Sequence, residues 1–266
     1  MNKMQNKFSL YDKKVLVSGA TGYLGRAMVY GLAELGATVL VNGRSEEHVK
    51  KLSQQLTKNG LTAIPAVFDI NDQDSVRSWF SDNCITQLNG LVNNAYSGNA
   101  GSLATATEDD YRNSYEIGLV SAHRLLQQAL PSLRTAVHYC GQASVVNIGS
   151  VYGVVSPDQR IYENTNAVNP PFYGAAKAAL LQWTRYAACE LGNEGIRVNA
   201  ISPGPFPSED VQETNPYFTA TLASKVPMGR IGQAEELQGP LSFLISDASS
   251  FVNGANLMVD GGWTCW

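Results

Sequence analysis

Short apolar runs rich in β-branched residues alternate with longer segments of helical periodicity along most of the 266-residue chain. The runs are almost continuously apolar, so both faces of the sheet that they form must be covered. Strands that alternate with helices build parallel βαβ units, whose right-handed crossovers place helices on both sides of one sheet. We therefore predict an α/β fold, a doubly wound sheet of about seven parallel strands in one domain over residues 1–266. The expected strands cover residues 14–18, 38–42, 63–68, 90–93, 144–148, 196–201 and 256–259.

Local signals mark the ends of several helices between these strands. Gly36 stops the first helix, and Ser45 with the acidic residues after it starts the second. The first predicted helix covers residues 26–35, and the helices after the second cover residues 72–80, 108–133 and 173–191. In a sheet of this kind the ligand crevice lies outside the carboxyl ends of the strands. The residues that directly follow each strand are therefore the first candidates for a binding site.

Composition excludes several classes of partner. The chain is 44% hydrophobic and 16% charged, with a net charge of −4 and no lysine or arginine stripe, so nucleic acid is not an expected partner. No apolar run approaches the roughly 20 residues that span a bilayer, and the polar first residues lack a signal-peptide core. We therefore expect a cytoplasmic protein with no membrane partner. Scattered cysteines and histidines without metal-ligand spacing indicate reduced thiols and no metal site: Cys84, Cys140, Cys189, Cys265, His48, His123 and His138.

The sequence SGATGYLG, directly after the first expected strand, predicts a phosphate-binding turn. The backbone N–H groups of such a turn and the positive end of the following helix hold a pyrophosphate without a cationic side chain. Its glycines, Gly19, Gly22 and Gly25, have the spacing G-x-x-G-x-x-G instead of the usual G-x-G-x-x-G. From this turn we expect the nucleotide to contact Gly19, Thr21, Gly22, Tyr23 and Leu24.

The end of the second expected strand distinguishes between the two nicotinamide nucleotides. An acidic residue there would bind the adenosine ribose and repel a 2′-phosphate, but the sequence VNGRS carries none. Arg44 offers a planar guanidinium suited to a phosphate, and Gly43 leaves room for one. We therefore expect NADP(H) in preference to NAD(H).

Three side chains at the same edge of the sheet suggest acid–base chemistry. Tyr173 and Lys177, in YGAAK, are four residues apart near the start of a helix, so both project from one face. A nearby ammonium favours the phenolate, and we expect Lys177 to lower the pKa of Tyr173 from about 10. Tyr173 would then act as a general acid or base, while Lys177 also reaches the nicotinamide ribose. Ser150, directly after the fifth strand, has a hydroxyl that can donate to a substrate oxygen.

Together with Asp69, NNA, IRVNAISPG and the closing VDGG, these motifs resemble the short-chain dehydrogenase/reductase family over nearly the whole chain. The resemblance implies a single-domain Rossmann-type fold and hydride transfer between NAD(P) and a small carbonyl or alcohol substrate. It makes Tyr173 the proton donor or acceptor, Lys177 the ribose-binding residue and Ser150 the residue that orients the substrate oxygen. It also implies a homo-oligomer, a dimer or tetramer packed through long helices. The further cofactor-binding residues that it implies are Asp69, Ile70, Asn94, Ala95, Pro203, Gly204, Phe206 and Ser208.

Three positions depart from the compact form of this family, to which the chain length and the later motifs point. The glycine spacing is that of the extended form, so Tyr23 stands where the compact pattern has a glycine. Tyr96 follows NNA in place of a glycine and adds bulk beside the active-site mouth. Gly118 stands where the family has an active-site asparagine that supports a water-borne proton relay, so we expect altered but retained catalysis.

Two segments are expected to cover the substrate. The loop at residues 151–172 joins Ser150 to Tyr173 and is longer than is usual in the compact form, and residues 205–228 would form a lid. The polarity of the first loop favours a polar, charged or sugar-like substrate over a steroid or long acyl chain. The alternative is a surface loop without substrate contact. Its polar residues are Asp158, Arg160, Tyr162, Glu163, Asn164 and Asn166.

The predicted function is that of an oxidoreductase that transfers a hydride between NADP(H) and a carbonyl or alcohol substrate of polar, sugar-like character. Two alternatives stay open. Gly118 suggests a catalytically impaired, nucleotide-binding regulatory or scaffold protein, and the glycine spacing suggests an epimerase- or dehydratase-type member of the family.

Overall fold

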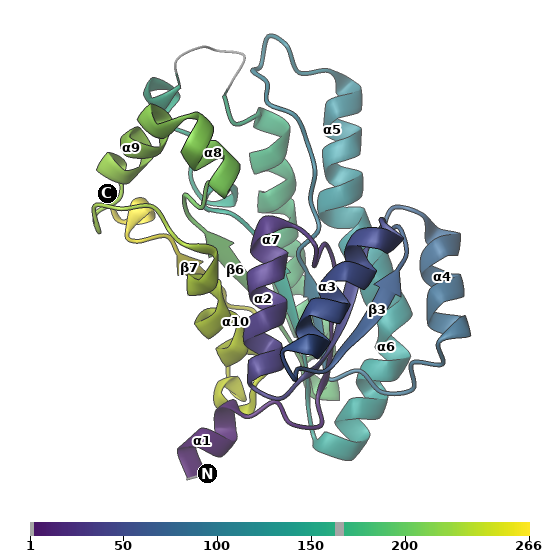
Figure 1. The fold of residues 1–266 in the computed structure, drawn as a ribbon. Helices are drawn as coiled ribbons and strands as arrows, with labels where there is room; N and C mark the ends of the chain where they lie inside the picture. Colours follow the sequence, from purple (N-terminus) through teal and green to yellow (C-terminus); the bar gives the residue numbers. More distant parts are fainter. Residues whose placement is uncertain (1–2, 163–167) are drawn as a thin grey trace.

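A computed structural model describes residues 3–162 and 168–266 and contains one seven-stranded sheet (Figure 1). All strand pairs are parallel, in the order β3-β2-β1-β4-β5-β6-β7. This order reverses direction between β1 and β4, which is the switch point of a doubly wound sheet and confirms the predicted fold class. The strands are β1 Lys14–Val17, β2 Thr38–Gly43, β3 Ala63–Val67, β4 Gly90–Asn93, β5 Ala143–Ile148, β6 Ile196–Pro203 and β7 Asn256–Val259.

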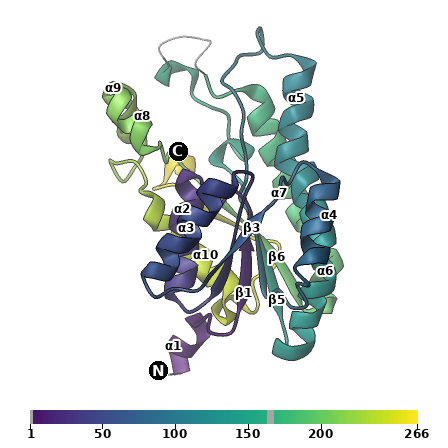
Figure 2. The same cartoon turned by 45° about the vertical axis from the view of Figure 1, so that its right-hand side comes forward.

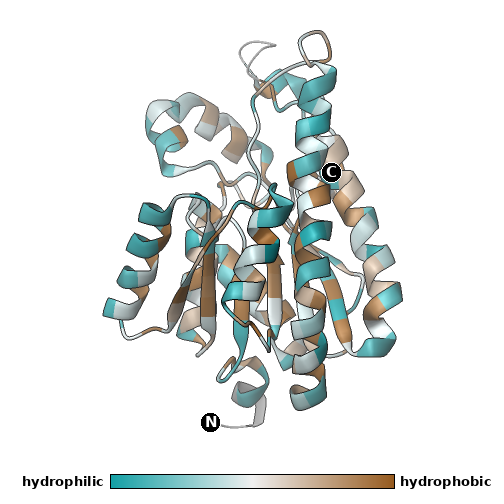
Figure 3. Cartoon of the chain, turned by 90° about the vertical axis from the view of Figure 1, so that its right-hand side faces the viewer, coloured by the Kyte–Doolittle hydropathy of each residue, from teal (hydrophilic) through white to brown (hydrophobic). Residues whose placement is uncertain are grey.

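Successive strand residues point to opposite faces, and each face has its own core. Val15 and Val17 of β1 pack toward α2, α3 and α10, whereas Leu16 packs toward α4, α6 and α7. Figure 2 shows these two helical layers on either side of the sheet, and Figure 3 shows apolar residues concentrated on the strands between them. The layers consist of α2 Tyr23–Glu34, α3 Glu46–Lys58 and α10 Gln238–Ile245 on one face, and α4 Gln73–Asp82, α6 Ser121–Cys140 and α7 Pro171–Leu191 on the other.

Side-chain caps begin several of these helices where the sequence predicts them. The Ser45 hydroxyl accepts a hydrogen bond from the His48 backbone N–H, and Asp72 accepts from the backbone N–H groups of Asp74 and Ser75. These bonds satisfy amide groups that a helix start otherwise leaves without a partner. The second and third crossovers therefore enter their helices directly after the strand ends that border the ligand crevice.

The long helix expected over residues 108–133 is interrupted, which corrects the sequence-based prediction. It consists of α5 Glu108–Tyr115, a π-helical turn Glu116–Val120 and α6, which continues to Cys140. The backbone N–H of Ser121 bonds the carbonyl of Glu116, and the Ser121 hydroxyl bonds the carbonyl of Ile117 at 2.7 Å. A π turn inserts one residue into a helix that otherwise continues, so a prediction of one unbroken α-helix over these residues does not include it.

The remaining described helices lie near the chain ends and beyond β6. The first is α1 Lys3–Phe8, while α8 Glu209–Thr214 and α9 Pro216–Lys225 follow β6 and pack against each other (Figure 1). Two short 3₁₀ turns, Val151–Gly153 and Gln159–Ile161, lie in the loop that joins β5 to α7. Among the helices in the described ranges, none has the length and apolar character needed to cross a membrane.

Candidate active site

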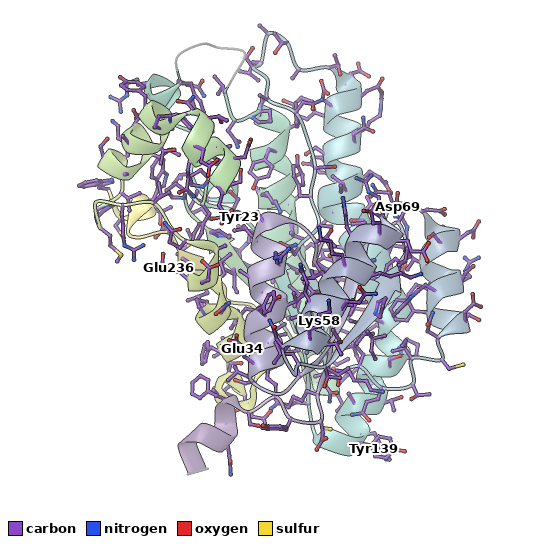
Figure 4. The ribbon with its side chains drawn as sticks, in the orientation of Figure 1. Tyr23, Glu34, Lys58, Asp69, Tyr139 and Glu236 are labelled. Atoms are coloured by element: carbon purple, nitrogen blue, oxygen red, sulfur yellow. The ribbon has the colours of Figure 1, made fainter. Side chains whose placement is uncertain are left out.

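A cavity of about 530 Å³ opens at the carboxyl ends of the strands, where the sheet changes direction. Its volume is in the range typical of cofactor pockets. Figure 4 marks two of its walls, with Tyr23 at the start of α2 and Asp69 just beyond β3. The predicted cofactor residues that line it are Gly19, Thr21, Gly22, Tyr23, Leu24, Arg44, Asp69, Ile70, Asn94, Ala95, Tyr173, Lys177, Pro203, Gly204 and Phe206.

One predicted cofactor residue lies apart from this cavity. The Ser208 side chain caps α8 by accepting from the backbone N–H of Val211, so its hydroxyl is engaged in the helix start. Sequence reasoning did not include several residues that do line the cavity. Phe68 and Asn71 follow the end of β3, and Ile117 lies on the π turn. For Phe68 and Asn71, the position just after a strand end was the sequence signal that could have identified them.

The glycine turn forms a tight cradle between β1 and α2. Gly19 has a φ of +61°, and a Cβ on it would lie 2.8 Å from the Ala95 Cα. A Cβ on Gly25 would lie only 2.2 Å from the Gly19 carbonyl oxygen. A Cβ on Gly22, by contrast, would lie 3.4 Å from the same oxygen, which is a near-normal contact. The close contacts of the turn with Ala95 and within its own backbone therefore require glycine at Gly19 and Gly25, but not at Gly22.

The neighbouring strand ends brace this turn through side-chain amides. The Asn94 amide nitrogen donates to the carbonyl oxygens of Ser18 and Gly19, at 3.0 Å and 3.1 Å. Behind it, Asn93 donates to Asn147 at 2.8 Å. The turn is thus held with its backbone exposed to the cavity at a helix N-terminus, an arrangement that fits the pyrophosphate of a dinucleotide.

The far end of the cavity presents Arg44 beyond β2. Asn42 donates to the carbonyls of Ala66 and Phe68, which ties the ends of β2 and β3 together below it. Arg44 is exposed and forms no salt bridge within the described ranges. Its guanidinium therefore has its donors available to an anion at the adenosine end.

Ser150, Tyr173 and Lys177 converge where β5 meets the start of α7, as the sequence predicts. Ser150 directly follows β5 and its hydroxyl accepts from the backbone N–H of Tyr152 at 3.1 Å. Pro171 occupies the first turn of α7, where its missing N–H costs nothing, and Tyr173 follows two residues later. Ser150 lies close enough to Tyr173 for its hydroxyl to act to lower the pKa of that phenol.

The expected effect of Lys177 on the Tyr173 pKa is wrong for this structure. The Lys177 ammonium is buried and donates to the Ile148 carbonyl at 2.7 Å, while it lies 5.7 Å from the Tyr173 ring centroid. Burial raises the pKa of Tyr173 above its ordinary value and lowers the pKa of Lys177 to about 8. Desolvation disfavours both charged forms and is the largest cause of both shifts. Tyr173 therefore carries its proton at neutral pH and is poised as a proton donor.

A tyrosine that breaks the family pattern lies at the centre of this group. The Tyr96 ring packs edge-on against Tyr173 with centroids 4.8 Å apart, and Lys177 Nζ lies 5.1 Å from the Tyr96 centroid. Its hydroxyl pairs with that of Ser114 at 2.8 Å. Burial raises the pKa of Tyr96, so it adds a neutral aromatic wall beside the buried ammonium.

A second cavity, of about 440 Å³, adjoins the first. Ser150 and Tyr173 line both cavities, so their two hydroxyls lie where the cavities meet. The 205–228 segment contributes several of its walls, including Phe206, Val211 and Phe218. A molecule in the second cavity would thus present an oxygen to Ser150 and Tyr173 beside a molecule held in the first.

The loop over residues 151–172 contributes to this second cavity through apolar and aromatic residues. Tyr152 and Tyr162 line it, whereas Asp158 pairs with Arg160 at 2.8 Å and with Lys225 at 3.5 Å. The charged residues of the loop that the structure describes, Asp158 and Arg160, therefore do not line the cavity. Glu163, Asn164 and Asn166 lie outside the described residues.

Comparison with known proteins agrees with this arrangement. A family model described as enoyl-(acyl carrier protein) reductase matches residues 19–264. The chain is 32% identical over 258 residues to a 3-oxoacyl-[acyl-carrier-protein] reductase of Pseudomonas aeruginosa, covering 96% of this chain and 98% of that protein. It is 34% identical over 263 residues to gluconate 5-dehydrogenase of Gluconobacter oxydans, covering 97% and 96%.

A solved structure shows the same fold over the full length. The gluconate 5-dehydrogenase of Burkholderia cenocepacia, in complex with NADP and tartrate, superposes with a TM-score of 0.87 at 28% identity and covers 99% of both chains. The chain belongs to the short-chain dehydrogenase/reductase family and is an NAD(P)-dependent oxidoreductase.

Proposed function

We propose that the protein interconverts a carbonyl compound and its secondary alcohol with NADP(H). The observation that carries this proposal is the position of the Ser150 and Tyr173 hydroxyls at the junction of the two cavities. A substrate oxygen at that junction would face two hydroxyl donors, one of them a buried phenol that keeps its proton at neutral pH.

The side chains have separate tasks in this scheme. Tyr173 donates its proton to the carbonyl oxygen during reduction and accepts it during oxidation. Ser150 donates a hydrogen bond to the same oxygen as negative charge develops on it. Lys177, whose ammonium lies 5.7 Å from the Tyr173 ring centroid, would be the cation that binds the ribose. Bound NADP(H) supplies or accepts the hydride.

The nucleotide would lie along the first cavity. The turn at Gly19 and Gly25 would bind the pyrophosphate, Asp69 and Ile70 would border the adenine, and Gly204 would allow close approach of the nicotinamide. The exposed Arg44 favours NADP(H), because a guanidinium pairs with a 2′-phosphate through two parallel hydrogen bonds. The NADP bound by the Burkholderia relative supports the same preference.

The substrate is proposed to be polar and sugar-like, a character that the neutral polar side chains of Asn99, Asn169 and Tyr152 at the second cavity support. We also propose a cytoplasmic homo-oligomer of two or four copies, packed through the long helices. Exposed aromatic side chains on those helices support such packing, with Tyr139 72% exposed and Tyr186 66% exposed.

Absorbance at 340 nm with NADPH and a panel of ketones, sugars and polyols tests the proposed reaction. Net oxidation of NADPH with a carbonyl substrate is expected. Tight NADPH binding without turnover on any panel member would favour the regulatory alternative. Conversion of substrate with no net change in the nucleotide would favour epimerase or dehydratase chemistry.

A further inference from the structure

We propose that the second cavity selects an uncharged cyclic carbonyl or hydroxy compound and rejects carboxylates. This inference rests on the proposed function and narrows its substrate class. It follows from which side chains form the walls of that cavity and from where the nearby charges are placed.

Aromatic rings dominate the walls. Tyr162 and Phe218 lie with their ring centroids 5.7 Å apart at an interplanar angle of 34°, and the hydroxyls of Tyr152 and Tyr162 approach to 3.4 Å. Flat aromatic faces make large contacts with the C–H faces of a ring, at little cost in side-chain entropy. The rings that line the cavity are those of Tyr96, Tyr152, Tyr162, Tyr173, Phe206, Phe218 and Trp263.

Within the part of the chain that the structure describes, no charged side chain lines the cavity. Two nearby cations, Arg160 and Lys225, are both held by Asp158. On α8, whose Val211 forms part of the wall, the exposed Glu209, Asp210 and Glu213 form no salt bridge with described residues. An anion bound in this cavity would therefore lose hydration without gaining a cationic partner from the described residues that line it.

The polar groups that do line the cavity are neutral. Asn99 and Asn169 offer side-chain amides, and burial raises the pKa of both Tyr152 and Tyr162, so these phenols keep their protons. Amides and phenols pair well with hydroxyl and carbonyl oxygens of an uncharged molecule. The cavity thus fits a hydroxylated ring, and it does not fit an open-chain sugar acid.

A matched pair of ketones tests the inference in the unmodified protein. The carboxamide and the carboxylate of the same oxocyclohexane ring differ little in shape and differ in charge at neutral pH. We expect kcat/KM with NADPH to be at least about tenfold higher for the carboxamide, because the carboxylate is desolvated without a partner. A smaller difference, or a preference for the carboxylate, overturns the inference.

A small diketone such as diacetyl separates this inference from the proposed function. Reduction of diacetyl without reduction of either ring overturns the cyclic substrate class and leaves the proposed reaction standing. Failure to reduce any of the three compounds overturns this inference, and the panel of ketones, sugars and polyols then decides the proposed reaction.

A variant of Val211 identifies the cause of the selectivity. Val211→Arg places a cation on the cavity wall, and we expect the carboxamide preference to fall by about tenfold or more. Val211→Gln, which adds a polar side chain without a charge, serves as the control and should keep the preference for the carboxamide over the carboxylate. The carboxylate activity gained by Val211→Arg should decline as salt is added. A Val211→Arg protein that still reduces the carboxamide with unchanged selectivity overturns the electrostatic explanation.

Discussion

The ring of Tyr96 fills the space directly beside Gly118. A Cβ built on Gly118 would lie 3.6 Å from Cε2 of Tyr96 and 3.4 Å from the Ala176 Cβ. The two positions that depart most clearly from the family pattern in this region are therefore neighbours in space. The absence of a side chain at Gly118 accommodates a bulky ring that also contacts Tyr173 and lies near the Lys177 ammonium.

A double-mutant cycle tests whether these two residues are coupled. Gly118→Asn should destabilise the protein by about 1–3 kcal/mol, because its Cγ, oxygen and nitrogen would enter space held by the Tyr96 ring. Combining it with Tyr96→Gly should recover part of that loss, with a coupling energy of about 0.5–3 kcal/mol. Urea unfolding of the four proteins measures the cycle. Strictly additive effects would show that the two sites are independent.

The Tyr173 phenol is expected to be the proton donor. Tyr173→Phe keeps the ring and removes the hydroxyl, so kcat should fall by at least about 100-fold, the usual effect of a general acid. NADPH affinity should stay near that of the unmodified protein. Tyr111→Phe removes a hydroxyl from another half-buried ring, one that packs on Phe172, and should leave kcat unchanged. Near-normal turnover by Tyr173→Phe would remove Tyr173 from the mechanism.

The position of Lys177 shows what spacing can and cannot predict. The interval from Tyr173 to Lys177 correctly predicts that both side chains reach one edge of the sheet. It does not specify the direction of a flexible four-carbon chain, whose ammonium bonds the Ile148 carbonyl. Likewise, composition shows Asp158 and Arg160 in the active-site loop, but not that they neutralise each other away from the cavity. The bond from Lys177 to Ile148 and the pairing of Asp158 with Lys225 are tertiary contacts that local sequence does not encode.

Burial of Lys177 makes stability depend on pH. Its pKa is about 8 in the folded protein, against 10.5 as the ordinary value. Between these two pH values the unfolded chain holds the proton and the folded chain does not, so stability rises with pH across the window. Below pH 8 both states are protonated, and the buried ammonium costs roughly 3 kcal/mol.

Lys177→Met removes this cost together with the catalytic amine. Its free energy of unfolding near pH 7 should exceed that of the unmodified protein by about 1–3 kcal/mol, since the lost bond to Ile148 offsets part of the gain. The difference should shrink toward pH 10.5. Lys51→Met, at an exposed lysine, provides the control. A difference that stays constant from pH 7 to pH 10.5 would contradict the assignment of the titration to Lys177.

Arg44 should set the preference between the two nucleotides. The unmodified protein is expected to bind NADPH more tightly than NADH, and Arg44→Ala should reduce that preference by about tenfold, the worth of a charged hydrogen bond to phosphate. Dissociation constants from fluorescence titration provide the measurement. Arg77→Ala, at an exposed arginine on α4 that pairs with Asp74, should leave the preference intact. Equal affinities for the two nucleotides in the unmodified protein would overturn the role of Arg44.

The unusual glycine spacing predicts unequal costs for alanine in the turn. At Gly25 the new Cβ would lie 2.2 Å from the Gly19 carbonyl oxygen and 2.9 Å from the Ala20 Cα, so backbone must move. Gly25→Ala should lower the free energy of unfolding by about 2 kcal/mol or more and weaken NADPH binding. Gly22 has a φ of −76°, which alanine adopts, and Gly22→Ala should cost less than about 1 kcal/mol. Equal losses in the two variants would show that the middle glycine is also required. The expected inequality would instead show that the turn needs glycine where Gly19 and Gly25 stand, and that its altered spacing preserves the close contacts of a phosphate-binding turn.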